Sequence, residues 1–243
     1  MKTKLLLTAV LATVWVSPAS AIILGVTFEG VGDHALVDEF YNGGIDSQGN
    51  SGTNLGLQFA GTARGAVDSD AGGGLQFQNN FDNAPSPDTV MNYASNNGRD
   101  PNDGVGVVNF AAGFDVGVSF LYSQAIQNSV VQIFSGLNGT GTELASFTLF
   151  ENWQDGCGQN VLAVAALGGG GGDPGPGFCN WDVVSIAFDG IAQSIILSGA
   201  AGKVLFDNLT LGSLEPVPLP AAVWLLGSGL LGFAAVRSRR LAA

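Results

Sequence analysis

The chain has 243 residues and a formal net charge of −12, with 20 Asp and Glu against eight Lys and Arg. It contains 37 glycines, two cysteines and a single histidine. So acidic a chain does not suit nucleic acid or an anionic membrane surface as a partner, because both are bound through basic side chains.

The N-terminus has the three parts of a secretory signal peptide. Lys2 and Lys4 precede an apolar segment at 5–16, and the small residues at 19–21 follow Pro18. The apolar segment has 12 residues, which is short for a transmembrane helix, and it ends at a cleavage-like site. Residues 1–21 are therefore predicted to be a signal peptide that is cleaved between Ala21 and Ile22.

The middle of the chain, residues 22–214, is predicted to be one exported domain. All 20 acidic residues lie between 22 and 216 with three basic ones, which gives this part a formal charge of −17. Its apolar residues alternate with a period of two in short segments that Gly, Asn, Asp and Pro separate. This pattern predicts an all-β domain, a jelly-roll β-sandwich. Strands are expected at 23–29, 55–60, 75–77, 116–122, 130–134, 143–150, 183–188, 194–197 and 204–211, with a hairpin at Asn138-Gly139.

The two cysteines are Cys157 and Cys179, with a Gly-rich segment at 168–177 between them. In an exported domain such a pair is typical of a disulfide. Closing this loop would contribute about 3 kcal/mol to stability. A zinc site is not predicted, because there is no second cysteine pair and His34 is the only histidine.

The sequence shows no catalytic motif, and we predict no enzymatic activity. His34 lies in an apparent loop without a nucleophile motif nearby, and is expected at the surface. Acidic, Gly-containing loops at 68–72 and 100–104 lack the spacing of an EF-hand and are expected to be solvated turns. Four aromatic residues could either stack on sugar rings or belong to the core: Tyr41, Tyr93, Trp153 and Trp181.

The C-terminal segment, 215–243, combines prolines, an apolar run and a basic end. Prolines occupy 216, 218 and 220, and only Ser228 is polar between 221 and 236. As a helix, 217–236 would span about 30 Å, enough to cross a bilayer. The basic end at 237–240, with Arg237, Arg239 and Arg240, would stop transfer and remain in the cytoplasm.

The motif Val217-Pro218-Leu219-Pro220-Ala221, with Trp224, a Gly-Ser-Gly and the arginine cluster after it, resembles the PEP-CTERM family of sorting signals in its VPLPA variant. The resemblance implies an exosortase, a membrane-embedded enzyme similar to cysteine transpeptidases, that acts on Val217, Pro218, Leu219, Pro220 and Ala221 as substrate. Such tags belong to Gram-negative bacteria that make extracellular polysaccharide and biofilm. An ordinary single-pass anchor is the alternative.

The domain itself is similar to galactose-binding-like and concanavalin-like sandwiches in three places: Thr27-Phe28-Glu29-Gly30, the turn at 41–45, and Phe206-Asp207-Asn208-Leu209. That resemblance implies that the first and last strands lie side by side. It also implies that Glu29 and Asp207 contribute, with loop carbonyls, to a structural calcium site. The alternative is that Asp207 and Asn208 end a strand and satisfy local amides.

Together these features predict an exported, exosortase-sorted protein of the cell envelope or extracellular matrix with a non-enzymatic domain. It would be anchored transiently in the inner membrane and then reach the cell surface or the medium. Two alternatives stay open: a calcium-dependent carbohydrate-binding module acting on extracellular polysaccharide, and a secreted hydrolase.

Overall fold

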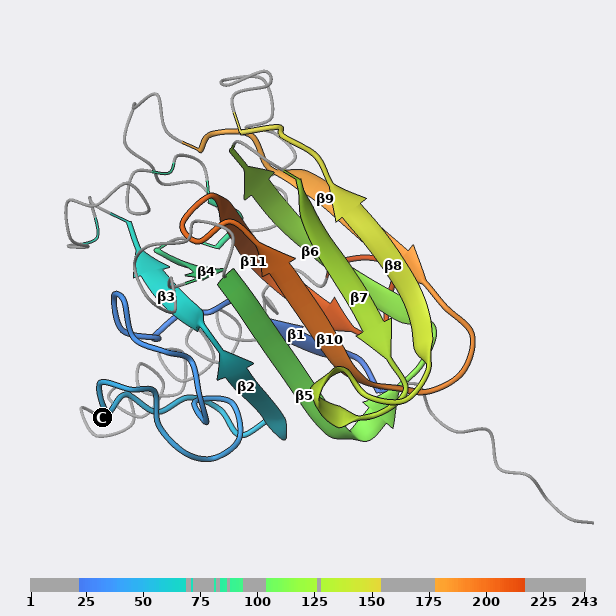
Figure 1. The fold of residues 1–243 in the computed structure, drawn as a ribbon. Coiled ribbons are helices and arrows are strands. Elements are labelled where there is room, and N and C mark those ends of the chain that lie inside the picture. Colours follow the sequence, from blue (N-terminus) through green and yellow to red (C-terminus); the bar gives the residue numbers. More distant parts are fainter. Residues whose placement is uncertain are drawn as a thin grey trace, which may run out of the picture.

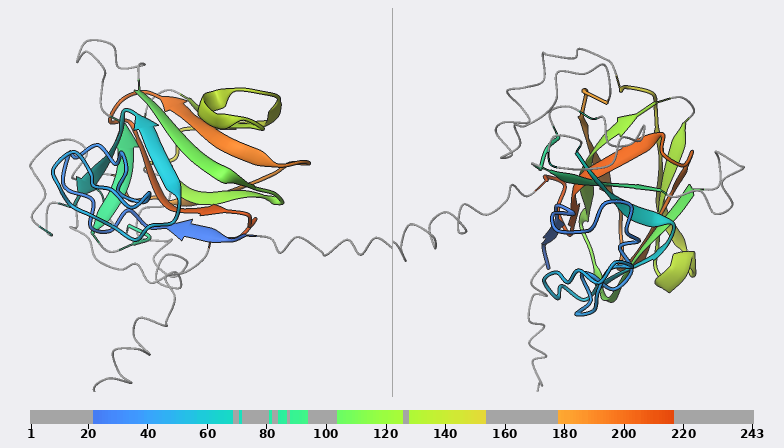
Figure 2. Two further views of the ribbon diagram at one scale, coloured as in Figure 1. Left: turned by 90° about the horizontal axis from the view of Figure 1, so that it is seen from below. Right: turned by 90° about the vertical axis from the view of Figure 1, so that its left-hand side faces the viewer.

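In the computed structural model two antiparallel sheets pack face to face (Figure 1, Figure 2). The structure describes residues 22–68, 71, 81, 84–86, 88–93, 104–125, 128–153 and 178–216. The first sheet contains β1 (Leu24–Val26), β3 (Ala63–Val67), β4 (Thr89–Tyr93), β6 (Gly117–Gln124), β9 (Asp182–Ala187) and β11 (Val204–Leu211). The second contains β2 (Leu57–Gly61), β5 (Gly104–Phe114), β7 (Ser129–Phe134), β8 (Glu143–Leu149) and β10 (Ala192–Gly199).

The strand order is β3-β4-β11-β6-β9 in the first sheet, with β1 also paired to β11, and β2-β5-β10-β7-β8 in the second. From β4 to β11 the chain crosses between the sheets at every step except the β7–β8 hairpin. This alternation is the strand order of a jelly roll. The predicted all-β sandwich is thus confirmed.

The core lies between the sheets and follows the two-residue period of the strands. In β7, for example, Ser129, Val131 and Ile133 are buried while the residues between them are half-exposed. Aromatic rings fill the end of the core near β1, where Phe28 meets Phe59 edge-on at 5.8 Å between ring centroids. Such a continuous apolar layer is what holds two sheets about 10 Å apart.

A second apolar cluster covers the outer face of the first sheet. It includes Leu121 and Leu205 from the strands, with Phe81 and Trp181 packed edge-on over them. Trp181 is 4% exposed, and Tyr41 and Tyr93 belong to the main core at 6% and 0%. These three aromatic residues are therefore core residues and not platforms for a sugar, the alternative that the sequence had left open.

The predicted strands from 116 onward all exist, with boundaries shifted by at most two residues; 204–211 coincides with β11. The strand expected at 23–29 ends early, because Phe28 has a left-handed backbone with φ of 62°. The sequence did not predict β3, β4 or β5. The expected strand at 75–77 lies outside the described residues.

The predicted hairpin is confirmed between β7 and β8, which pair antiparallel from Ser129–Leu149 onward. Its turn contains a short 3₁₀ helix, η1 (Leu137–Gly139), with Asn138 at φ of 55° and Gly139 at φ of 69°. Both residue types tolerate this left-handed backbone. The turn folds back onto the second sheet, where the amide of Asn138 donates to Asn109 Oδ1 at 2.8 Å.

The segment after β8 is fixed to the first sheet by one buried side chain. Asn152 accepts a hydrogen bond from the Gln124 backbone N–H at 2.7 Å and donates to the Tyr122 carbonyl at 3.2 Å and to Asp182 Oδ2 at 2.9 Å. With Asn152 4% exposed, this amide connects the second sheet's edge strand to β6 and β9. The backbone on both sides of it is thereby held in place.

Several predicted features lie outside the described residues: the signal peptide, the sorting motif with its arginines, and Cys157. Cys179 is buried, with its sulfur 3.5 Å from the Trp153 carbonyl oxygen. The disulfide therefore stays a prediction. Within the part of the chain that is described, no helix is long and apolar enough to cross a bilayer.

Candidate metal centre

The first and last strands bring Glu29 and Asp207 together. β1 pairs antiparallel with the end of β11, with Val26 opposite Leu209. Glu29 follows β1 after the left-handed Phe28, and Asp207 precedes the left-handed Asn208, where the register of β11 against β6 shifts. The predicted neighbourhood of the two strands is confirmed, and Glu29 is close enough to Asp207 to raise the pKa of Asp207.

Asp207 is completely buried, at 0% exposure. Its Oδ2 accepts hydrogen bonds from Ser86 N at 2.6 Å and Ser86 Oγ at 2.7 Å. Its Oδ1 accepts one from the backbone N–H of Asn208 at 2.7 Å. No basic side chain is among these partners, so neutral donors alone compensate the buried carboxylate.

Glu29 is half-buried and bonds to the same loop. Its Oε1 accepts from Thr89 N at 2.9 Å and from Asp88 N at 3.1 Å. Its carboxylate also bonds to the Ser86 side chain. Ser86 therefore lies between the two carboxylates and joins the chain segment before β4 to both strands.

The hydroxyl of Ser86 is surrounded by oxygen acceptors. Its Oγ lies 2.9 Å from the Thr27 carbonyl oxygen, 3.3 Å from that of Thr89 and 2.7 Å from Asp207 Oδ2, in addition to the Glu29 contact. A hydroxyl has one proton to donate. When both carboxyl groups are ionised, the cluster thus has more acceptors than this proton can satisfy, and a cation among these oxygens would remove the deficit.

Burial is the main cause of the raised pKa values at this site. It raises the pKa of Asp207 to about 8, and hydrogen bonds from Ser86 and Asn208 only partly offset it. The pKa of Glu29 is also raised, first by burial, against the lowering effect of the Thr89 and Asp88 amides. The pKa of Tyr41 is raised by burial and by Asp207. Desolvation without a counter-charge favours the neutral acids.

At the same bulge, the side chain of Asn208 also lacks hydrogen-bond partners in the described part of the chain. It is 1% exposed, and among the described residues neither its Oδ1 nor its Nδ2 has a hydrogen-bond partner. Buried amides nearly always find partners.

The donor set fits calcium. Calcium takes six to eight oxygen ligands, from carboxylates, carbonyls and waters. The cluster offers the carboxylates of Glu29 and Asp207, the Ser86 hydroxyl and the carbonyls of Thr27 and Thr89, without nitrogen or sulfur ligands that would favour zinc. Among the described residues, no group of three or more Asp, Glu, His or Cys side chains could hold a metal ion. The carboxylate ligands of this site are therefore the two from Glu29 and Asp207.

The remaining sequence candidates do not join this cluster. Asp68, expected in a solvated turn, is buried at 0% exposure, which corrects that prediction for this residue. Asp70 and the loop at 100–103 lie outside the described residues. His34 is partly exposed, with Nε2 3.4 Å from Asp33 Oδ2.

Ser86 and Thr89 were missed from the sequence. Ser86 bonds to Asp207 across 121 positions, and a Ser between two prolines has no local pattern that points to a carboxylate so far away. By contrast, a neighbourhood of Glu29 and Asp207 was accessible through the resemblance to known sandwiches.

No protein-family model matches the chain, and no curated protein matches its sequence. Among solved structures it is similar to a family 6 carbohydrate-binding module whose binding subsites were dissected, at 14% identity and a TM-score of 0.33, over 65% of this chain and 87% of that one. It is similar to a carbohydrate-binding module of Cellvibrio mixtus lichenase 5A in complex with cellotriose, at 12% identity and a TM-score of 0.29, over 63% and 87%. It is also similar to part of an isomalto-dextranase of Arthrobacter globiformis, at 11% identity and a TM-score of 0.31, over 81% of this chain and 33% of that one. At these scores the likenesses say nothing about what this chain binds.

Proposed function

We propose that this chain is an exported, exosortase-sorted protein of the bacterial envelope or extracellular matrix, with a non-enzymatic sandwich that a structural calcium ion closes. The observation that carries the calcium assignment is the oxygen cluster around Ser86, where the carboxylates of Glu29 and Asp207 and the carbonyls of Thr27 and Thr89 surround one hydroxyl. The signal peptide and the C-terminal sorting motif support export and anchoring in the inner membrane.

Calcium in this site would neutralise two carboxylates and so remove the cost of burying them. Glu29 lies just after β1, Asp207 lies at the bulge of β11, and Ser86 lies in the segment before β4. These three pieces of chain are far apart in sequence. The site would therefore work as a crosslink between the first strand, the last strand and the loop before β4.

Calcium titration of the full chain in detergent tests the site. We expect the melting temperature to rise with calcium and to fall again with a chelator, and magnesium to give a smaller shift because it demands a tighter octahedral shell. Asp207→Asn should abolish the shift. Asp189→Asn, in an exposed turn, is the matched control and should keep it. A wild-type chain that melts at one temperature with calcium and with chelator would refute calcium binding.

The tail contributes substrate and not catalysis. An exosortase would cleave near residues 217–221, which contain the proline motif, and release the domain from its anchor to the cell surface or the medium. We propose no reaction for the domain itself, because Ser86 and Asp207, whose hydroxyl and carboxylate are in contact, are both completely buried.

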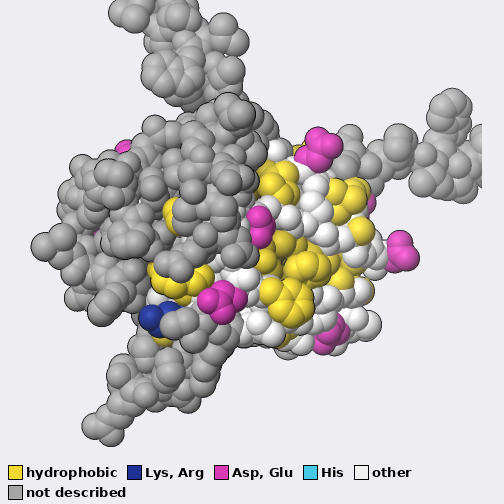
Figure 3. All heavy atoms as spheres, turned by 90° about the horizontal axis from the view of Figure 1, so that it is seen from above, with side chains coloured by type: hydrophobic (Ala, Val, Ile, Leu, Met, Phe, Trp, Pro, Cys, Tyr) yellow, Lys and Arg dark blue, Asp and Glu magenta, His cyan; other side chains and the backbone are white. Residues whose placement is uncertain are grey.

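Carbohydrate binding is the second candidate, and one observation favours it. Phe150 is 60% exposed, and the half-exposed Trp153 lies three residues further on, where its Nε1 donates to Glu151 Oε1 at 3.1 Å. The hydrogen bonds of the Asn152 side chain, here called the Asn152 clamp, fix the backbone between Phe150 and Trp153. Figure 3 shows this end of the molecule from above, with hydrophobic side chains gathered among acidic ones. Rigid aromatic faces beside carboxylates can stack on sugar rings and accept hydroxyl hydrogen bonds.

A pull-down with insoluble neutral polysaccharides tests this second candidate. We expect the full chain to be retained, and the variant Phe150→Ser with Trp153→Ser to be lost from the bound fraction. Val116→Ser, at an exposed apolar residue far from Phe150, serves as the control. Equal retention of the wild type and the double variant would rule out this surface.

A further inference from the structure

The end of the sandwich from which the C-terminal segment leaves carries a group of exposed apolar side chains. Of the large hydrophobic residues that are exposed in the described part, five are in the segments that meet there: Ile22 (44%), Ile23 (54%), Val116 (47%), Ile191 (64%) and Leu214 (39%). We call these five residues the apolar rim. Isolated exposed apolar residues are ordinary, but a group at one end needs a reason.

The backbone shows that these segments are neighbours. Gly117 opens β6 opposite the end of β9, and Val118 pairs with Leu211 at the end of β11. A Cβ on Gly117 would collide with the side chain of Leu214, and one on Gly113 would collide with Ile191. In Figure 1 the β5–β6 and β9–β10 connections both lie at the lower right end of the sandwich.

Both ends of the domain emerge at this place. Gly212 lies against the carbonyl of Ile22, so the first residue after the predicted signal peptide touches the exit of the last strand. Ser185 Oγ donates to the Leu214 carbonyl, which holds the exit segment against β9. The apolar run of the tail begins at Val217, three residues after Leu214. Little chain separates the rim from the segment that is proposed to enter the bilayer.

Val116, one of the rim residues, has a strained backbone. It is a β-branched residue with φ of 69°, a backbone region that Gly, Asn or Asp would occupy at far lower cost. Its side chain is 47% exposed, so burial in the core does not compensate this strain. The Gly117 N–H donates to the Asp115 carbonyl at 2.8 Å, so Val116 is the central residue of a γ-turn that connects β5 to β6.

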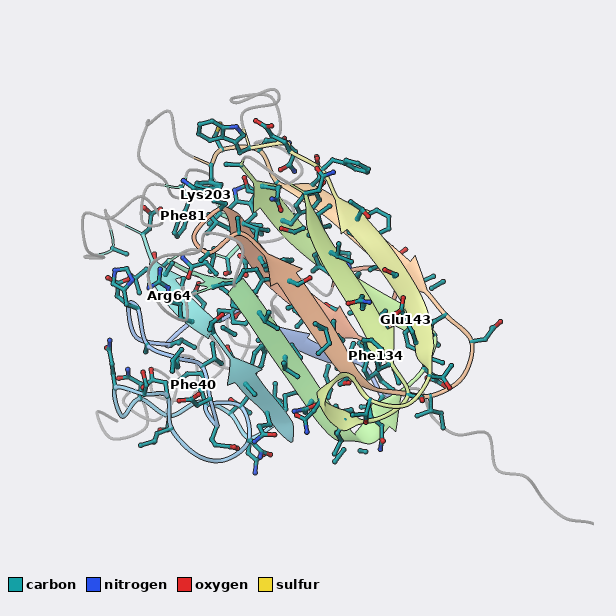
Figure 4. The ribbon with its side chains drawn as sticks, viewed as in Figure 1. Phe40, Arg64, Phe81, Phe134, Glu143 and Lys203 are labelled. Carbon is teal, nitrogen blue, oxygen red and sulfur yellow. The ribbon has the colours of Figure 1, made fainter. Side chains whose placement is uncertain are left out.

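We infer that the apolar rim is a membrane-contact surface, with which the domain sits on the bilayer that holds its own tail. This inference rests on the proposed function, because the tail places the rim at the membrane. The described part has two basic residues, and both lie away from the rim: Figure 4 shows Arg64 at the left and Lys203 at the upper left. The rim segments themselves carry Asp115, Asp189 and Glu215. The contact is therefore hydrophobic and suits a zwitterionic lipid surface, not attraction to anionic headgroups.

Photolabelling by lipid tests the contact. The full chain is reconstituted in phosphatidylcholine vesicles that contain a diazirine on the acyl chain near the headgroup, and adducts are mapped by peptide mass spectrometry. We expect adducts on the tail and on the turns at 114–117 and 188–191. The exposed residues Phe147, Phe150 and Val183, on or next to the edge strands β8 and β9, should stay unlabelled and serve as the internal control.

The outcomes separate this inference from the proposed anchor. A labelled tail with an unlabelled rim would overturn the membrane contact and leave the anchor intact. An unlabelled rim that is nevertheless shielded from solvent would indicate that a second copy of the protein covers it instead. An unlabelled tail would overturn the anchor, while rim adducts in that experiment would still support lipid contact. A chain without adducts in either place would overturn both.

One substitution separates function from structure. Val116→Asn should relieve the backbone strain and raise the melting temperature by about 2 °C, yet reduce adducts on the 114–117 turn at least threefold. Val183→Asn, at a similarly exposed valine on β9, should leave those adducts unchanged. Unchanged labelling in the Val116 variant would show that this valine does not serve a membrane contact.

Discussion

Raising the pH of the metal-free chain should destabilise it. Burial raises the pKa of Asp207 from 3.8 to about 8, so in this range the native state holds a proton that the unfolded state has lost. The stabilisation is complete below the unfolded pKa and disappears as the pH rises through the folded pKa. A shift of about four units corresponds to about 5 kcal/mol in total, of which about 3 kcal/mol falls between pH 5.5 and 8.

Thermal unfolding of the full chain in detergent with a chelator measures this effect. Asp and Glu residues of ordinary pKa are already ionised at pH 5.5, so the window isolates the buried pair. A loss of about 3 kcal/mol corresponds to a drop of about 6–12 °C in melting temperature for a domain of this size. Excess calcium should flatten the profile, because the native carboxylates are then ionised throughout.

Two variants make the result specific. Asp207→Asn should remove most of the pH dependence, although it leaves an amide facing the donors of Ser86 and costs about 1–3 kcal/mol of stability at low pH. His34→Gln removes the only histidine and should keep the slope. A metal-free wild-type profile that is flat or rises from pH 5.5 to 8 would contradict the assignment of a raised Asp207 pKa.

Three further predictions concern the rest of the chain. Mass spectrometry of the mature protein should find Ile22 at the N-terminus and loss of the segment after about Pro220; an intact C-terminus in cells with a working exosortase would count against processing. Non-reducing peptide mapping should link Cys157 to Cys179, and two free thiols would refute the disulfide. Asn152→Ala should lower the free energy of unfolding by about 2–3 kcal/mol in denaturant titration, since it leaves several buried partners unpaired; a loss below 0.5 kcal/mol would show that the clamp carries little stability.

Alternation of apolar residues predicted β7 and β9, because these strands have one buried and one wetter face. The predictions of β6 and β11 also succeeded, although both strands are buried at every position. Alternation failed for β5, where Gly104 and Gly106 look like turn residues. In the structure both are places where a Cβ would crowd the ring of Tyr93. Glycine serves close packing there, a use that a single sequence does not distinguish from a turn.

The candidate site divides in the same way. Glu29 and Asp207 stand in motifs near the two ends of the domain, so a resemblance could bring them together before any coordinates. Ser86 and the carbonyls of Thr27 and Thr89 join them only through tertiary contacts. Neither residue type nor spacing predicts such partners, because backbone carbonyls carry no sequence signal and the loop that holds Ser86 is set by packing.

The position of β11 would connect folding with the proposed export. This strand is last in sequence yet central in the first sheet, where it pairs with β1, β4 and β6. Until β11 has crossed the membrane, β1, β4 and β6 lack their shared partner strand, and Glu29 lacks its neighbour Asp207. Only nine residues separate Asp207 from Val217, where the proposed anchor begins. If the chain is exported as proposed, the sheet and the proposed metal site would therefore close only when the tail reaches the membrane.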